Sequence, residues 1–156
     1  MTTLVLIRHA KSDWGDPGLD DHDRPLNDRG LRDAPRQAER LAETGFRPDA
    51  IIASTAVRAA TTAGFFSGVF DVPVELDEQL YGAPASVLLR SAAQRRVGRV
   101  IVVAHDPGMT VLAERLSNGG IAHMPTCAVA TFEWDTADWD VATAVDPASW
   151  AFTVPR

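Results

Sequence analysis

The sequence has few of the residues that mark cysteine-rich or membrane-bound proteins. Its 156 residues include one cysteine, Cys127, which excludes an internal disulfide and a cysteine-rich zinc site. Cys127 begins an apolar stretch, 127–130, that is typical of a buried strand, so we expect it in the core. No basic leader precedes the first apolar run, and no run approaches the length of a membrane span. The sequence therefore predicts a soluble, cytoplasmic protein.

Positive charge is also scarce. Fifteen Lys and Arg against 21 Asp and Glu give a formal net charge of -6. This balance disfavours non-specific binding to nucleic acid or to anionic lipid, so we expect neither as a partner. Any anion that the chain binds must be attracted by a local group of cations. The hydrophobic content of 46% is enough for one compact core, and residues 1–156 are predicted to form a single domain.

Apolar runs that predict strands alternate with segments of helical spacing. The expected strands are residues 3–7, 49–53, 72–76 and 99–104, and the expected helices are the segment from Asn27 to about Gly45 and residues 56–66, 84–94 and 109–116. In the first helix, Leu31, Ala34, Ala38 and Leu41 form the predicted buried face. Residues 128–134 and 139–145 flank a short polar segment and predict an antiparallel hairpin. The fold class is therefore α/β, a three-layer α/β/α sandwich around a mixed, mostly parallel sheet.

Polar residues follow three of the predicted strands at the point where each strand ends. Arg8 and His9 follow the first strand, the segment 54–58 follows the second, and His105 follows the strand 99–104. The carboxyl ends of parallel strands open onto one crevice, so these side chains are expected to meet there. Two arginines and two histidines with few acids predict a site for an anion. The loop 11–27, rich in Asp, Gly and Pro, is long enough to be functional.

These residues resemble a known family. Arg8-His9-Ala10-Lys11-Ser12 is similar to the Arg-His-Gly signature of the histidine phosphatase superfamily, in the variant of SixA-type phosphohistidine phosphatases. Residues 54–61 and 103–105 resemble the second and third motifs of that superfamily, which supply an arginine and a second histidine. Two positions depart from the pattern: Ala10 replaces the usual glycine, and Gly15 stands where mutases carry an asparagine after the tryptophan. The resemblance implies a phosphoglycerate mutase-like fold and a phosphatase that uses no metal and no other cofactor.

The resemblance also implies roles for individual residues. His9 is the expected nucleophile that forms a covalent phosphohistidine, while Arg8 and Arg58 bind the phosphoryl oxygens and His105 donates a further hydrogen bond. An imidazole attacks phosphorus only while unprotonated, so we expect a backbone carbonyl to hold the proton on the other ring nitrogen of His9. Arg24, which precedes Pro-Leu, is expected to reach the phosphate, the alternative being a surface arginine paired with neighbouring aspartates.

A proton donor for the leaving group is harder to assign. Glu78 stands where the mutase branch carries its general acid, although a solvated carboxylate is the alternative, and Asp77 or Asp106 are substitutes. Trp14 follows the nucleophile and is a candidate wall of the substrate entrance. His22 lies between aspartates in the long loop, and we interpret it as solvated because consecutive ligands seldom close a metal shell.

Chain length favours one branch of the superfamily. There is no room for the large cap insertions with which mutases, acid phosphatases and phytases enclose their substrates, so we predict an open site that accepts a phosphorylated protein, such as a histidine phosphotransfer domain. One alternative is a phosphatase of a small phosphomonoester, a sugar phosphate or a nucleotide, which a working Glu78 favours. Another is a non-catalytic phosphate-binding module.

Overall fold

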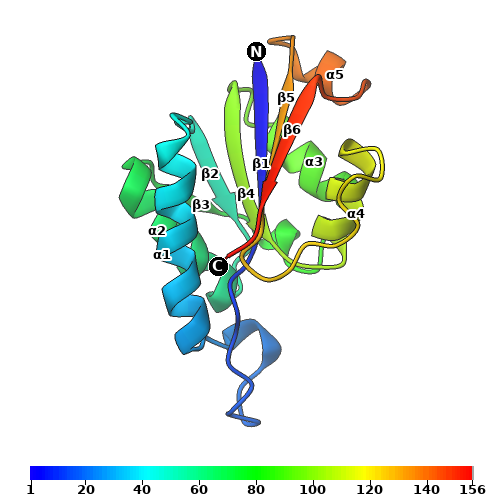
Figure 1. Ribbon diagram of the computed structural model, residues 1–156. Helices are drawn as coiled ribbons and strands as arrows, with labels where there is room; N and C mark the ends of the chain where they lie inside the picture. Colours follow the sequence, from blue (N-terminus) through cyan, green and yellow to red (C-terminus); the bar gives the residue numbers. More distant parts are fainter. Residues whose placement is uncertain (156) are drawn as a thin grey trace.

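The computed structural model describes residues 1–155 and contains one six-stranded sheet with helices on both of its faces (Figure 1). In chain order the elements are β1 (Thr2–Arg8), η1 (Asp21–Asp23), α1 (Asp28–Glu43), β2 (Ala50–Ala53), α2 (Val57–Phe70), β3 (Val74–Leu76), η2 (Glu78–Leu80), α3 (Ala85–Ala93), β4 (Arg99–Ala104), α4 (Gly108–Leu116), β5 (Val129–Trp134), α5 (Trp139–Ala142) and β6 (Ser149–Thr153).

The sheet is mixed and mostly parallel, as the sequence predicted. Its strand order is β3-β2-β4-β1-β5-β6. The first four strands run parallel, with Leu4 opposite Val100 in the β1–β4 ladder. β5 runs antiparallel to both β1 and β6. β1 and β4 are therefore central, and their side chains are covered on both faces.

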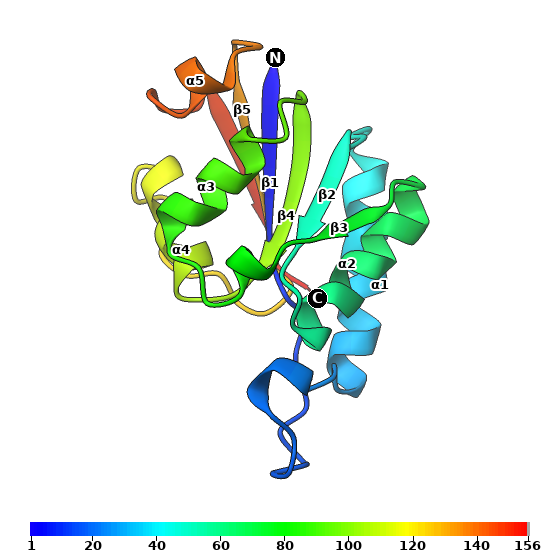
Figure 2. The same ribbon diagram turned by 180° about the vertical axis from the view of Figure 1, so that it is seen from behind.

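Alternate residues of the central strands pack into two separate cores. Val5 and Ile7 point to the layer of α1 and α2, where Phe66 is buried against them. Leu4 and Leu6 point to the opposite layer, which α3, α4 and α5 cover. The views from both sides show these helix layers flanking the sheet (Figures 1 and 2). The predicted three-layer sandwich is confirmed, and it follows from the period of two along each strand.

The C-terminal segment differs from the predicted hairpin. Residues 139–142 form the short helix α5 rather than a strand, and β5 pairs instead with β6, Ser149–Thr153. Asp138 caps α5 by accepting a hydrogen bond from the Asp140 N–H. The alternation of Trp139, Val141 and Val145 suggested a strand, but one helical turn buries Trp139 while leaving Val141 exposed.

Helix α1 begins at the predicted cap. The Asn27 side chain accepts a hydrogen bond from the Gly30 N–H, and Ala34, Ala38 and Leu41 are buried as expected. Leu31, by contrast, is 46% exposed and lies outside the buried face.

The loop 11–27 extends from the carboxyl end of β1 and projects beyond the sheet, at the end where β2 and β4 also finish (Figure 2). A bridge between Ser12 and Leu26 closes its base, and η1 lies within it. Within residues 1–155, no helix is both long and apolar enough to span a bilayer.

Candidate active site

The three predicted motifs meet at the carboxyl ends of neighbouring parallel strands. His9 follows β1 and His105 follows β4, and their ring centroids are 5.1 Å apart. Arg58 is the second residue of α2, the helix that follows β2. Backbone hydrogen bonds fix these strand ends together: the His9 N–H donates to Ala104 and the Ser54 N–H donates to Val103.

The imidazole of His9 is held in one tautomer. Its Nδ1 lies 2.8 Å from the Ala10 carbonyl oxygen. A carbonyl only accepts, so Nδ1 carries the proton and Nε2 keeps its lone pair. Burial is the largest cause that lowers the pKa of His9, to about 3. The hydrogen bond to the Ala10 carbonyl raises this pKa, and the proximity of His105, Arg58 and Arg8 lowers it further. The ring is therefore neutral at physiological pH, which is the state that a nucleophilic imidazole needs.

His105 is also neutral and is positioned by Ser54. Its Nε2 lies 2.7 Å from the Ser54 hydroxyl, which already accepts a hydrogen bond from the Ala56 N–H. Ser54 can therefore donate its own proton to Nε2, and the ring proton then resides on Nδ1. Burial and the charge of Arg58 lower the pKa of His105 to about 4.

Three buried nitrogen atoms of the motifs have no hydrogen-bond partner among the described residues. They are Nε of Arg8, Nε of Arg58 and Nδ1 of His105. Each is a donor in the protonation states argued above, and buried donors are seldom left unpaired in folded proteins. Unpaired donors on two arginines and a histidine are of the type that binds an oxyanion.

Arg24 is buried, in contrast to the alternative of a surface arginine. Its Nη1 donates to the Ser12 hydroxyl at 2.8 Å, and its Nε and Nη2 lie 3.2 and 3.1 Å from Oδ1 of Asp21. Its guanidinium carbon lies 3.5 Å from the centre of the Trp14 ring, whose own side chain is 71% exposed. Trp14 therefore covers one face of Arg24 at the surface of the molecule.

The three carboxylates considered as acids lie in different surroundings. Glu78 is exposed at the start of η2. Asp77 caps η2 and pairs with Arg95 at 3.5 Å. Asp106 lies 3.5 Å from Nη1 of Arg8 and accepts hydrogen bonds from Thr110 in the first turn of α4. Of the three, only Glu78 has a carboxylate without a partner among the described residues.

His22 is not the solvated loop residue that we expected. It is half-buried, its Nε2 lies 2.8 Å from the Thr55 hydroxyl, and its ring meets Tyr81 edge-on with centroids 4.9 Å apart. The long loop therefore packs against the second motif through this histidine.

Two residues that the sequence analysis did not single out contact the predicted site. Asp21 accepts hydrogen bonds from Arg24 and Arg58, and Tyr81 donates its hydroxyl proton to Asp21 at 2.6 Å. The Tyr81 ring also lies 5.5 Å from that of His105. Their only signals in the sequence are that Asp21 stands three residues before Arg24 and Tyr81 three residues after Glu78.

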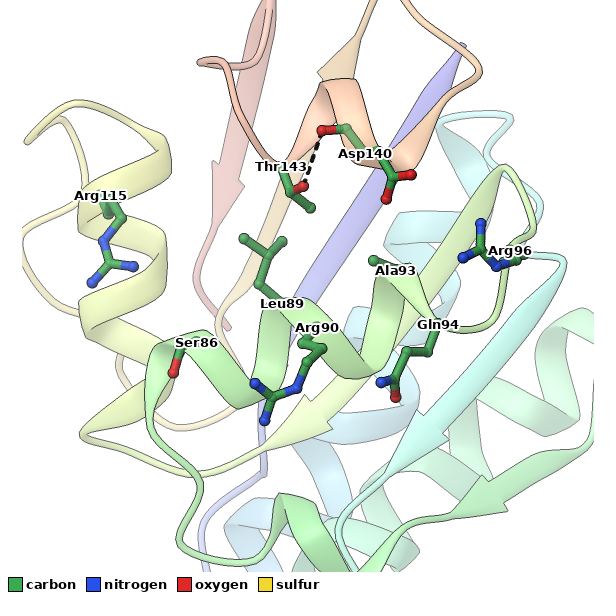
Figure 3. Close-up of a pocket in the computed structure, with 9 residues that line it drawn as sticks. All are labelled: Ser86, Leu89, Arg90, Ala93, Gln94, Arg96, Arg115, Asp140 and Thr143. Carbon is green, nitrogen blue, oxygen red and sulfur yellow. Dashed lines mark hydrogen bonds between the residues drawn. The ribbon is translucent and has the colours of Figure 1, made fainter.

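A groove of about 340 Å³ lies in a different region, between α3, α4 and α5 (Figure 3). Arg90, Arg96 and Arg115 border it but point to different sides of it. None of the motif residues lines this groove.

Comparison with known proteins places the chain in a family. Residues 4–82 match the histidine phosphatase superfamily (branch 1). An uncharacterized protein of Mycobacterium leprae is 30% identical over 96% of this chain and 100% of its own length. The SixA protein of Agrobacterium tumefaciens superposes with a TM-score of 0.82 at 29% identity, covering 99% of each chain. The protein histidine phosphatase SixA in complex with tungstate superposes with a TM-score of 0.77 at 18% identity, over 98% of this chain and 95% of the other.

The match to half of the chain, together with the geometry of the motifs, shows that the chain belongs to the histidine phosphatase superfamily. Within that superfamily, its fold is similar to those of the SixA structures. The resemblance inferred from the sequence is therefore confirmed.

Proposed function

We propose that this protein is a phosphatase in which His9 accepts the phosphoryl group from a protein phosphohistidine and passes it to water. The observation that carries the proposal is the neutral imidazole of His9, with its proton on Nδ1 and its lone pair on Nε2, beside three buried donors without partners. This combination supplies the nucleophile and the charge stabilisation that phosphoryl transfer requires.

The reaction has two steps. In the first, Nε2 of His9 forms a bond to phosphorus while the bond from phosphorus to the substrate nitrogen breaks, and the departing imidazole takes up a proton. In the second, water attacks phosphorus and releases a proton to solvent, which balances the proton taken up in the first step; the bond to Nε2 breaks, and inorganic phosphate leaves with His9 restored. Arg8, Arg24, Arg58 and His105 stabilise the charge on the phosphoryl oxygens in both steps. No metal or nucleotide takes part.

The surface around the site supports a protein substrate. Trp14 and Tyr81 are exposed, and the loop 11–27 lies beside the second motif, which it contacts through His22 and Asp21. A surface of this kind admits a phosphorylated side chain carried by another protein. The proposed partner is therefore a phosphohistidine-bearing protein, such as a histidine phosphotransfer domain.

A small phosphomonoester is the second candidate, and the exposed carboxylate of Glu78 favours it. Cleavage of an alkyl phosphate needs a proton donor, whereas the nitrogen–phosphorus bond breaks more readily. Glu78 lies three residues before Tyr81, whose ring contacts that of His105. If Glu78 is the acid, Glu78→Gln will slow an alkyl phosphate far more than a phosphohistidine.

The deciding experiment compares release of phosphate from a phosphohistidine-bearing phosphotransfer protein, an aryl phosphate and an alkyl phosphate, with a chelator present. The proposal expects the phosphoprotein to have the highest kcat/KM and His9→Ala to abolish its turnover. Acid-labile radioactive phosphate should be trapped on the wild-type chain and not on His9→Ala.

The other outcomes separate the alternatives. Faster turnover of the esters than of the phosphoprotein would move the assignment to a small-molecule phosphatase. Binding of phosphate without turnover of any substrate would indicate the non-catalytic module.

A further inference from the structure

The carboxylate of Asp21 connects three side chains from distant parts of the sequence. Its Oδ1 accepts from Nε and Nη2 of Arg24, at 3.2 and 3.1 Å. Its Oδ2 accepts from Nη2 of Arg58 at 3.0 Å and from the Tyr81 hydroxyl at 2.6 Å. The Asp21 backbone oxygen accepts a further bond from Nη1 of Arg58 at 2.7 Å. A single residue of η1 thus fixes groups from the long loop, from α2 and from the segment after η2.

Asp21 is much more exposed to solvent than the two arginines that it binds. The side chains of Arg24 and Arg58 are 9% and 7% exposed, whereas that of Asp21 is 51% exposed. Asp21 therefore closes over two buried guanidinium groups from the solvent side. The hydrogen bond from Tyr81 is the largest cause that holds the pKa of Asp21 below its ordinary value, and the two arginines lower it further. Asp21 is an anion whenever the protein is folded near neutral pH.

The role of Asp21 depends on which N–H groups of Arg24 and Arg58 it leaves unbound. Arg58 gives one N–H of Nη1 and one of Nη2 to Asp21, while its Nε is buried without a partner. Arg24 has at least one N–H of Nη2 left, because a guanidinium has five and Asp21, Ser12 and Asp13 account for four. Asp21 therefore binds part of each donor set and leaves Nε of Arg58 and one N–H of Arg24 without a partner among the described residues.

We infer that Asp21 is a positioning residue, which orients Arg24 and Arg58 for the phosphoryl group, with Tyr81 fixing Asp21 in turn. This inference rests on the proposed function, because it assigns those two arginines to phosphoryl oxygens. A flexible arginine loses rotamer freedom when it binds phosphate, and a side chain already held on one edge has less to lose. The contact of Arg24 with Trp14 restricts the same guanidinium on its face.

The test measures binding of tungstate by calorimetry, because binding needs no turnover. We expect Asp21→Asn to weaken tungstate affinity about tenfold or more, and kcat/KM for phosphohistidine to fall in parallel, since misplaced groups commonly have effects of this size. Asp21→Glu should recover part of the affinity, and Tyr81→Phe should weaken it about threefold. Asp20→Asn is the matched control, because it makes the same change of charge in the same loop and Asp20 makes no side-chain capping bond.

Each result decides the inference. Affinity for tungstate that is unchanged or tighter in Asp21→Asn would overturn it, because Asp21 would then be a bystander or a competitor of the anion. An equal loss in Asp20→Asn would also overturn it, since the effect would be one of net charge. A wild-type chain that binds tungstate but hydrolyses no substrate would refute the proposed function alone, and the comparison of affinities would still decide the role of Asp21.

Discussion

At the scale of single residues, the chemistry of the site depends on which ring nitrogen of each histidine carries the proton. The Ala10 carbonyl fixes the tautomer of His9, and Ser54 can fix that of His105. The Ala10 carbonyl raises the pKa of His9 and the charge of Asp21 raises that of His105, but burial is the larger cause in both cases and keeps the two rings neutral. The positive charge of the site therefore comes from its arginines alone in the free protein.

The importance of guanidinium geometry can be tested at Arg58. Arg58→Lys keeps the charge but removes Nε and the planar fork, so we expect kcat/KM to fall by about two decades, the usual effect of losing one charged donor to the transition state. Arg90→Lys, at an exposed position on α3 beside the groove of Figure 3, is the matched control and should retain wild-type kinetics. Steady-state kinetics on one phosphoprotein substrate suffice. A lysine variant as active as the wild type would show that charge alone is needed at this position.

The residues of the site were predictable from the sequence to different extents. His9, Arg58 and His105 follow apolar strands, and the parallel arrangement of those strands is enough to place them together. Asp21 and Tyr81 were not predictable, because their contacts depend on how an aperiodic loop of Asp, Gly and Pro folds back over α2. No local pattern encodes the distance between residues 21 and 81.

At the scale of elements, strands covered on both faces were predicted well, and the edge strand β6 was not. β1 and β4 are continuous apolar runs with few other conformations open to them. β6 is an edge strand with four exposed residues of five, so its sequence carries little pattern. The error at 139–145 has the same origin, because a capped helical turn and a short strand bury similar numbers of apolar side chains.

The contact between α1 and the first motif gives a prediction about stability. A Cβ at Gly30 would collide with the backbone oxygen of Lys11, two residues after His9. Gly30→Ala should therefore lower the free energy of unfolding by about 1 to 3 kcal/mol, as overpacking usually does. Gly64→Ala, in α2 with no atom within 4 Å of the added Cβ, is the control and should raise it by about 0.5 to 1 kcal/mol.

Urea denaturation of both glycine variants checks this prediction. The sign of the difference between them is decisive, because both changes add the same methyl group within a helix. A Gly30→Ala chain as stable as the wild type would mean that the first turn of α1 can move away from Lys11.

At the scale of the whole molecule, a chain of net charge -6 holds a local group of arginines. Arg8, Arg24 and Arg58 lie at one end of the sheet, and Asp21 and Asp106 pair with them. The acidic remainder disfavours the binding of polyanions, while under the proposed function these arginines attract a phosphoryl group. That residues 1–156 form a single domain remains a prediction.

The two buried histidines make the stability of the molecule depend on pH. Their pKa values in the folded protein, about 3 for His9 and about 4 for His105, lie below the ordinary value of 6.5 for a histidine. Between these limits the unfolded chain binds protons that the folded chain does not. The contribution of each neutral ring to the free energy of unfolding is therefore fully present above pH 6.5. It is lost as the pH falls through about 4 for His105 and about 3 for His9.

We expect the free energy of unfolding to decrease between pH 6.5 and 4.5, with each of these histidines contributing up to about 1.4 kcal/mol per pH unit. The double variant His9→Asn and His105→Asn should show a flatter dependence, and each single variant should lie between it and the wild type. Urea denaturation at intervals of half a pH unit measures the slopes. Stopping at pH 4.5 keeps the contribution of Asp21 small, because its lowered pKa changes stability mainly below its ordinary value of 3.8. If the double variant keeps the wild-type slope, the two rings are not held neutral by the fold, and the state of His9 proposed for catalysis is wrong.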